Sequence, residues 1–143
     1  SDSDVEVLKQ LLKVFGEAFE DHATYQDDVP SDTYLRSLLR RSYFIAVVAV
    51  NGHEVVGGLA AYELDKFEQD RREIYIYDLA VSAKHRRRGI ATALINKLKR
   101  LAQERGAYVI FVQADKEDDA AIRLYESVGT KEDVFHFDIV VST

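Results

Sequence analysis

The chain has 143 residues, of which 47% are hydrophobic and 31% charged, and its formal net charge is −6. This composition predicts one globular domain spanning residues 1–143, and the acidic excess argues against a nucleic-acid partner. No apolar run approaches about 18 residues and no signal peptide is evident, which argues against a membrane partner. The chain contains no cysteine, so disulfides, zinc–thiolate sites and a cysteine nucleophile are excluded. We therefore expect a cytoplasmic protein, and the four dispersed histidines predict no metal site.

In the first half of the chain, the spacing of apolar residues predicts two helices and a hairpin. The first helix is expected from Asp4, as its N-cap, to about His22, and the second from Pro30 to about Arg41. Residues 43–50 and 53–64 read as two strands. The Asn51-Gly52 pair between them is typical of a tight hairpin turn.

The second half predicts a strand over 73–82, a helix over 91–105 stopped by Gly106, and a buried strand over 107–114. A last helix, capped by Asp118 or Asp119, should stop at Gly129, and residues 132–141 should form a final strand or hairpin. A strand, a helix and a second strand in succession imply parallel neighbours. Ligands on open α/β sheets bind at the carboxyl ends of such strands, here residues 78–81 and 113–115.

Between the strand over 73–82 and the next helix lies the sequence His85-Arg86-Arg87-Arg88-Gly89-Ile90-Ala91-Thr92. A glycine turn into a helix N-terminus presents backbone N–H groups and a favourable dipole to phosphate. Adjacent arginines can pair with a pyrophosphate in a fork geometry. The segment therefore predicts a cradle for a diphosphate cofactor. The alternative is a solvated basic turn, and Lys84 or Arg88 could simply face solvent.

The pattern Arg86-x-x-Gly89-x-Ala91 resembles the pyrophosphate loop of the Gcn5-related N-acetyltransferases, which bind acetyl-CoA. The predicted order of elements also resembles that α/β (α+β) fold, a central mixed, mostly antiparallel sheet flanked by helices. One element departs from the family pattern, because the strand that normally precedes the first helix is missing. Whether it was trimmed or is absent stays open. Its loss would expose a sheet edge near residues 43–50.

Several longer sequence segments resemble one particular group within this family. They are similar to the small, acetyl-CoA-dependent aminoglycoside 3-N-acetyltransferases from about Phe15 onward, in residues 66–69, 74–81, 85–95, 106–110, 112–115 and 136–139. The resemblance implies transfer of the acetyl group of acetyl-CoA to the 3-amino group of the deoxystreptamine ring of gentamicin-like drugs, which confers antibiotic resistance.

This resemblance assigns a cofactor site. The backbone of the strand over residues 77–81 would hold the pantetheine arm, and an N–H of Leu79, Ala80 or Val81 would polarise the thioester carbonyl. The alternative role of these last three side chains is plain core packing. The pyrophosphate would bind the segment from Arg86 to Thr92, that is, Arg86, Arg87, Arg88, Gly89, Ile90, Ala91 and Thr92.

Asp78 is the first catalytic candidate, because a charged residue inside an apolar strand is rare unless it is paired or functional. It could bind the substrate ammonium or accept its proton. The alternative is a structural ion pair with an arginine, and Glu73 is a weaker candidate. By resemblance, Tyr125 is the general acid, with packing on the cofactor arm as its alternative.

Asp115 is a substrate-binding candidate from its place at the end of a strand. Glu68, Asp138 and His136 are candidates by resemblance only. A polycationic acceptor would need several such carboxylates. Two other functions stay open: an acetyltransferase for a different amine, such as a polyamine, a metabolite or a protein N-terminus, and a non-catalytic acyl-CoA-binding module. A homodimer is compatible with the sequence.

Overall fold

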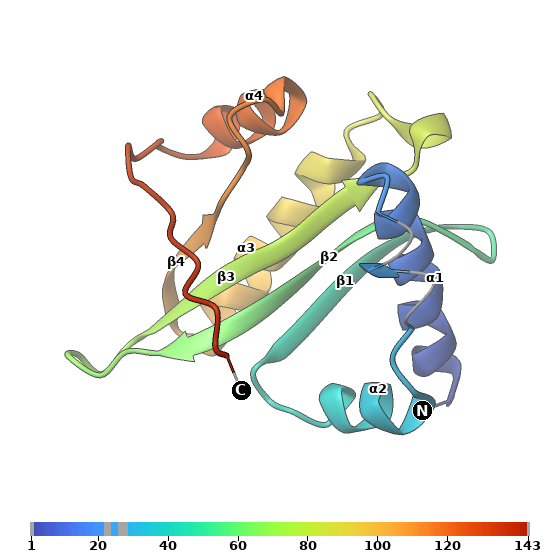
Figure 1. Ribbon diagram of the computed structural model, residues 1–143, viewed down its shortest axis with the longest axis horizontal. Coiled ribbons are helices and arrows are strands. Elements are labelled where there is room, and N and C mark those ends of the chain that lie inside the picture. Colours follow the sequence, from blue (N-terminus) through green and yellow to red (C-terminus); the bar gives the residue numbers. More distant parts are fainter. Residues whose placement is uncertain (1, 22–23, 26–28, 143) are drawn as a thin grey trace. The chain divides into compact units, whose positions relative to one another are not determined.

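The computed structural model describes residues 2–21, 24–25 and 29–142 and divides into two compact units, 1–113 and 114–143. The first unit contains α1 (Asp2–Ala18), α2 (Asp32–Leu39), β1 (Phe44–Asn51), β2 (Glu54–Asp65), β3 (Arg72–Val81), the short helix η2 (Ala83–His85), α3 (Ile90–Arg105) and β4 (Ala107–Val112) (Figure 1). The second unit contains α4 (Asp119–Val128).

The four strands form one sheet in the order β1-β2-β3-β4. β1 and β2 are antiparallel, β2 and β3 are antiparallel, and β3 and β4 are parallel. This is the predicted mixed, mostly antiparallel sheet, and the α3 crossover makes β3 and β4 the expected parallel neighbours. The Asn51-Gly52 turn is also confirmed, because Asn51 faces Glu54 and Gly52 adopts a φ of 67°. Within the described residues β1 is an edge strand, as expected without a preceding strand.

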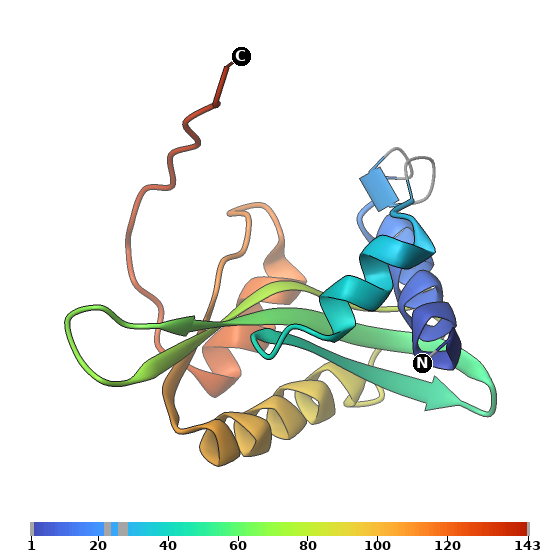
Figure 2. The same cartoon turned by 90° about the horizontal axis from the view of Figure 1, so that it is seen from below.

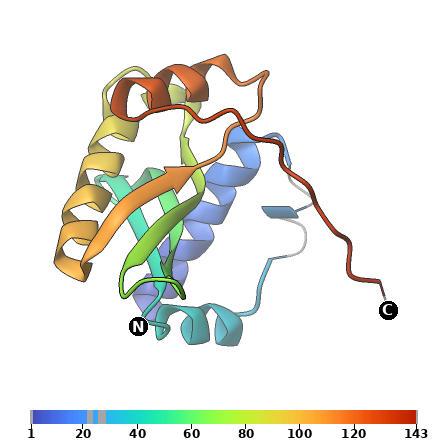
Figure 3. The same cartoon turned by 90° about the vertical axis from the view of Figure 1, so that its left-hand side faces the viewer.

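Helices cover both faces of the sheet. α1 and α2 lie on one face and α3 lies on the other (Figures 2 and 3). The α3 face holds the larger core cluster, which includes Leu59, Ile74, Ile76, Leu94 and Leu98. On the α1 face a second cluster joins Leu11, Val14, Phe15, Val55 and Ala80. Each face of the sheet therefore carries its own core, and side chains on alternate positions of each strand enter different cores.

Glycines at both ends define α3. Gly89 is the N-cap, with a φ of 76°, and Gly106 is the C-cap, with a φ of 74°. The Gly106 N–H bonds the carbonyls of Ala102 and Gln103, which satisfies groups that the helix end leaves free. Both glycines lie in the left-handed region, where a Cβ is unfavourable. The predicted stop at Gly106 is confirmed.

Several helix and strand boundaries differ from the predicted ones. α1 begins at Asp2, so Asp4 lies inside its first turn, where a negative charge favours the helix dipole, and does not cap it. The helix ends at Ala18, and the predicted end at His22 falls outside the described residues. β4 is not the buried strand expected over 107–114. It stops at Val112, and two of its six residues are exposed and none is buried, because it is an edge strand of the described sheet.

In the second unit the predicted helix is confirmed, with Asp118 as its cap. The Asp118 carboxylate accepts a hydrogen bond from the Ala121 N–H at 3.1 Å. The final strand predicted over 132–141 is wrong for the single chain. No strand is assigned among residues 130–142, although their sequence alternates as a strand would. A strand requires a hydrogen-bonding partner, and this segment has none in its own unit.

Candidate active site

A β-bulge in β3 sets the direction of Asp78. In the pairing with β2, Ala60 faces Asp78 and Ala61 faces Ile76, so Tyr77 is the extra residue. Ile74 and Ile76 point into the α3-side core. Strict alternation would send Asp78 into the same apolar core. The bulge shifts the alternation by one residue, and Asp78 therefore turns to the α1 face.

On that face Asp78 meets Tyr25. The Tyr25 hydroxyl donates a hydrogen bond of 3.1 Å to Oδ1 of Asp78. The Tyr25 ring packs against Phe15 and Phe19 of the α1 region, with centroid distances of 6.0 and 5.7 Å. Among the residues described, no arginine forms an ion pair with Asp78, which removes the support for that structural alternative. The carboxylate is instead held by one neutral donor anchored in an aromatic cluster.

Burial changes the acid–base properties of both partners. It raises the pKa of Asp78 above its ordinary value, and the Tyr25 hydrogen bond opposes that rise. Burial is also the main cause of a raised pKa for Tyr25, with the neighbouring Asp78 charge adding to it. Tyr25 therefore stays a neutral donor throughout the physiological range, and Asp78 is a better proton acceptor than an exposed aspartate.

Beside Asp78 runs a row of aromatic side chains that crosses three strands. We call Tyr62, Tyr75, Tyr77 and Phe111 the aromatic row. The Tyr62 and Tyr77 rings lie 6.2 Å apart, those of Tyr77 and Tyr75 5.6 Å apart, and those of Tyr75 and Phe111 are stacked at 4.7 Å. Tyr77 is 64% exposed. The row is a partly open apolar surface with hydroxyl groups, next to a carboxylate.

Close to Asp78, the parallel strands β3 and β4 stop pairing with each other. β3 pairs with β2 as far as Val81, but with β4 only from Arg72 to Ile76. Beyond Ile76 the backbone of β3 has no described strand partner on its β4 side. The side chains of residues 79–81 do pack in the core, Ala80 on the α1 side and its two neighbours on the α3 side. The core role and a backbone role are therefore compatible for Leu79, Ala80 and Val81.

The basic loop follows directly. The Arg86 guanidinium donates from Nε to the carbonyl of Val81 at 3.2 Å, which ties the loop to the end of β3. His85 bonds the Ser82 hydroxyl through Nδ1 at 2.8 Å. Arg87 adopts a φ of 64°, so two residues of this short loop lie in the left-handed region. The side chains of Arg86, Arg87 and Arg88 are exposed.

The loop fits a pyrophosphate. A Cβ built on Gly89 would meet no atom within 4 Å, so the space in front of this backbone is open. No side chain caps the N-terminus of α3, and Gly89 leads into Ile90, Ala91 and Thr92, the first residues of that helix. The free N–H groups of this first turn, beside three exposed arginines, are suited to phosphate oxygens. The residues present therefore fit the diphosphate of acetyl-CoA.

Glu68 and Glu73 lie at the opposite end of β3. Lys66 pairs with Glu68 at 3.3 Å and with Glu73 at 2.6 Å, and Tyr108 donates to Glu73 at 2.9 Å. The Lys66 bond lowers the pKa of Glu73, with Tyr108 adding to the effect. Arg72 starts β3, and at about 3.3 Å per residue Asp78 lies about 20 Å further along the strand. The structure thus does not bring Glu68 next to Asp78.

The remaining candidates belong to the second unit. Tyr125 is half-buried in α4, and its carbonyl accepts a bond from the Gly129 N–H at 2.8 Å. Asp115 is exposed, and its carbonyl accepts from the Asp118 N–H at 3.0 Å. Asp138 is exposed and contacts His136 at 2.8 Å. The roles of Tyr125, Asp115 and Asp138 stay predictions.

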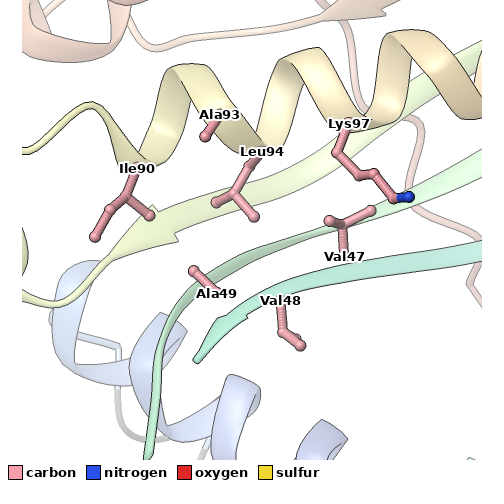
Figure 4. Close-up of a pocket in the computed structure, with 7 residues that line it drawn as sticks. All are labelled: Val47, Val48, Ala49, Ile90, Ala93, Leu94 and Lys97. Carbon is pink, nitrogen blue, oxygen red and sulfur yellow. The ribbon is translucent and has the colours of Figure 1, made fainter. Parts of the chain in front are cut away.

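A separate apolar pocket lies between β1 and α3 (Figure 4). Its lining is apolar apart from one lysine and consists of Val47, Val48, Ala49, Ile90, Ala93, Leu94 and Lys97. The pocket borders β1, an edge strand of the described sheet, and its lining residues include no carboxylate or histidine. Within the part of the chain that the structure describes, no group of three or more histidine or acidic residues could hold a metal, and no helix is long and apolar enough to cross a membrane.

Sequence reasoning missed Tyr25 and the aromatic row. One signal was available for the row, because Tyr75 and Tyr77 alternate with Ile74 and Ile76 and therefore should share a face. No local pattern marks Tyr25. Its partner Asp78 is 53 residues away in sequence, so the pair becomes visible only in the fold.

Comparison with known proteins supplies independent findings. The model of the acetyltransferase (GNAT) family matches residues 8–130. A crystal structure of an aminoglycoside acetyltransferase from an uncultured soil metagenomic sample has 60% sequence identity and a TM-score of 0.96, over 99% of this chain and 95% of that one. A second aminoglycoside acetyltransferase from such a sample, solved in complex with sisomicin, has 33% identity and a TM-score of 0.91, over 99% and 93% of the two chains.

Curated relatives are more distant. N-acetyltransferase 8B of Rattus norvegicus is 30% identical over 82 residues, which are 57% of this chain and 37% of that protein. N-acetyltransferase 8 of Homo sapiens is 30% identical over 84 residues, 59% and 37% of the two chains. The chain thus spans well under half the length of these relatives.

Proposed function

Because the chain belongs to the acetyltransferase (GNAT) family, we propose that it transfers the acetyl group of acetyl-CoA to the 3-amino group of the deoxystreptamine ring of gentamicin-like aminoglycosides. The activity would confer resistance to these drugs in the cytoplasm. The observation that carries the acceptor class is the 60% identity, over nearly the whole chain, to an aminoglycoside acetyltransferase. The position on the drug rests on the sequence resemblance to the 3-N-acetyltransferases.

The acceptor side of the site suits an aminosugar. Asp78 offers a carboxylate to an ammonium group, and the aromatic row next to it offers ring faces and hydroxyl groups to sugar rings. The second soil enzyme binds sisomicin, which supports a similar ligand here. Asp115, Glu68 and Asp138 are proposed as further contacts to the ammonium groups of the drug.

On the cofactor side, acetyl-CoA supplies an activated acetyl thioester. The free N–H groups at the start of α3, from Ile90 to Thr92, and the side chains of Arg86, Arg87 and Arg88 would bind the pyrophosphate. Gly89 keeps the backbone accessible, because nothing fills the space in front of it. The backbone of β3 beyond Ile76, which has no described strand partner on its β4 side, would align the pantetheine arm, and an N–H of Leu79, Ala80 or Val81 would polarise the carbonyl.

Two residues would move protons. An amine attacks only when it is neutral, and at neutral pH most drug amines carry a proton. Asp78 would receive that proton directly or through water, and its raised pKa makes it the better acceptor. Tyr125 would donate a proton to the departing sulfur. A phenolic hydroxyl is a hydrogen-bond donor suited to that role.

A thiol-release assay tests the proposal. The protein is incubated with acetyl-CoA and gentamicin, spermine or no acceptor, and the product is mapped by NMR. We expect thiol release with gentamicin and acetylation at the 3-amino nitrogen. Release only with spermine would replace the drug by another amine. Cofactor binding without release under any condition would leave a non-catalytic acyl-CoA-binding module.

A further inference from the structure

The segment between β3 and α3, residues 82–89, holds an unfavourable backbone conformation, and we call it the cofactor loop. Arg87 has a φ of 64° and Gly89 a φ of 76°. A glycine adopts this left-handed region freely, but an arginine does so only at a cost, so the surrounding structure must hold the loop there. The side chains of residues 86–88 are exposed and supply no packing for this purpose.

The ring of His85 supplies two anchors for the loop. It is half-buried, with Nδ1 lying 2.8 Å from the hydroxyl of Ser82 and Nε2 lying 3.5 Å from Nδ2 of Asn51. An amide nitrogen only donates, so Nε2 accepts from Asn51 and the ring proton lies on Nδ1, which donates to Ser82. One neutral imidazole thus connects the start of the cofactor loop with the end of β1.

The two groups that His85 joins are themselves held by the sheet. The Ser82 N–H donates to the carbonyl of Val56 at 2.7 Å, one residue beyond the end of β3. Asn51 is the last residue of β1 and pairs with Glu54. The His85 N–H also donates to the Ser82 carbonyl at 3.0 Å, so ring and backbone close the same turn. The imidazole therefore ties the cofactor loop to two fixed points.

We propose that His85 is a positioning residue for the cofactor. By bridging Ser82 and Asn51, its ring holds residues 86–89 in the conformation that binds the diphosphate of acetyl-CoA. The inference rests on the cofactor site proposed above and on no particular acceptor, and His85 itself does not need to touch the cofactor. Without the ring, the strained loop relaxes into other conformations. The apparent affinity then falls with the fraction of molecules that stays competent to bind.

Substitutions that keep one bond at a time test the proposal. By isothermal titration calorimetry, His85→Ala should weaken acetyl-CoA binding about fivefold or more, the effect of losing one ordinary hydrogen bond. An asparagine amide can take the place of Nδ1, so His85→Asn should recover most of the affinity through Ser82. A glutamine amide reaches only the place of Nε2, so His85→Gln keeps the long contact to Asn51 and should recover little. Ser82→Ala should add no further loss to His85→Ala, because both remove the same bond.

Trypsin measures the state of the loop without any cofactor. The exposed arginines at 86–88 are cleavage sites that become available when the loop opens locally. Mass spectrometry should show that His85→Ala is cut at these three positions severalfold faster than the wild type, with cleavage elsewhere unchanged. In steady-state kinetics the KM for acetyl-CoA should rise, while the gentamicin KM at saturating acetyl-CoA should stay the same.

His53→Ala is the matched control, because His53 is an exposed histidine two residues after Asn51. It should change neither acetyl-CoA affinity nor cleavage. Wild-type affinity in His85→Ala, with circular dichroism showing a folded chain, would overturn the inference and leave the proposed function intact. Weaker binding without faster cleavage at residues 86–88 would also overturn it, since the loop would then not have moved. A wild type that binds no acetyl-CoA would overturn the proposed function and this inference with it.

Discussion

The carboxylate of Asp78 is subject to two opposing influences. Burial favours its neutral form, and the hydrogen bond from Tyr25 favours its charged form. In an enzyme this balance is useful, because an aspartate with a raised pKa holds a proton more readily than an exposed one. In the folding equilibrium the same burial is a cost, since an ionised carboxylate loses part of its hydration.

Asp78→Asn should therefore separate activity from stability. The amide keeps the size and the bond from Tyr25 but removes the charge, so kcat/KM for gentamicin should fall by about 10²-fold or more, with little change in acetyl-CoA affinity. The folded-state pKa of Asp78 is raised, so its stabilising contribution is present at low pH and is lost as pH rises through that pKa. At pH 7.5 the variant should melt at the same temperature as the wild type or higher.

Steady-state kinetics and differential scanning calorimetry measure the two halves of this prediction. Near-normal kinetics in a folded variant would reduce Asp78 to a structural role. A clearly lower melting temperature would mean that the ionised carboxylate stabilises the fold, contrary to the effect of its burial.

Tyr25→Phe should act through Asp78. Losing the hydroxyl removes the bond that lowers the pKa of Asp78, so the acidic limb of the kcat/KM profile should move to higher pH. A hydrogen bond to a charged group contributes about 1.5–3 kcal/mol, so the limb should move by about one pH unit or more. The pH–rate profile distinguishes this from simple loss of packing.

Tyr108→Phe is the matched control for Tyr25→Phe. It removes an equivalent tyrosine–carboxylate bond, to Glu73, at the other end of β3. Its acidic limb should coincide with that of the wild type. If both variants shifted the limb equally, the effect would not come from the contact between Tyr25 and Asp78.

At the scale of elements, local signals predicted most of the first unit. The Asn51-Gly52 pair turns the hairpin and Gly106 ends α3, each through chemistry within a few residues. The bulge at Tyr77 was not predictable, because it depends on the register with β2. Asp78 could thus be chosen from sequence, but neither its direction nor its partner could.

The C-terminal segment, residues 130–142, shows a different limit of prediction from sequence. Its alternating apolar residues predict a strand, and the chain alone does not form one over residues 130–142. Side-chain pattern defines which face of a strand is apolar, but pairing needs a second backbone. The prediction that β4 is a buried strand was wrong for a related reason. An apolar run in the sequence does not show that the strand will lie at the edge of the sheet.

Gly89→Val tests the cradle at the start of α3. A β-branched residue at a φ of 76° costs roughly 1–2 kcal/mol, but the open space around it should let the fold survive. The side chain would stand where the pyrophosphate approaches the backbone, so acetyl-CoA affinity should fall by about tenfold or more, as expected for losing about 1.4 kcal/mol or more. Isothermal titration calorimetry measures the loss.

Gly106→Val is the matched control, because it introduces the same backbone strain outside the proposed cofactor site. Gly106 has a φ of 74°, and a Cβ there would meet only the end of the Arg72 side chain, at 3.8 Å. This variant should lose similar stability but bind acetyl-CoA normally. Unchanged affinity in folded Gly89→Val, or an equal loss in both variants, would place the cofactor cradle elsewhere.

At the scale of the whole molecule, charge is distributed unevenly. The chain has a net charge of −6, yet three arginines in succession occupy the loop before α3. An acidic protein attracts a polycation over a distance, while a local basic cluster holds an anion. The two proposed ligands carry charges of opposite sign. The acidic surface therefore favours the aminoglycoside, and the basic loop favours acetyl-CoA.

The acceptor KM should therefore respond to ionic strength. Raising salt from about 0.05 M to about 0.5 M shortens the Debye length from roughly 14 Å to roughly 4 Å. If Asp78, Asp115 and Asp138 line the acceptor site, the gentamicin KM should rise severalfold over this range.

Acetyl-CoA binding depends on charge as well, so the measurement needs saturating acetyl-CoA at every salt concentration, with two different salts to exclude specific ion effects. Asp78→Asn is the internal control. With one carboxylate removed, its gentamicin KM should be higher at low salt and should rise less steeply. A KM that stays flat in the wild type would count against an acidic acceptor site. It would favour a neutral or singly charged substrate, because screening changes the binding of a ligand only in proportion to the charge that the site recognises.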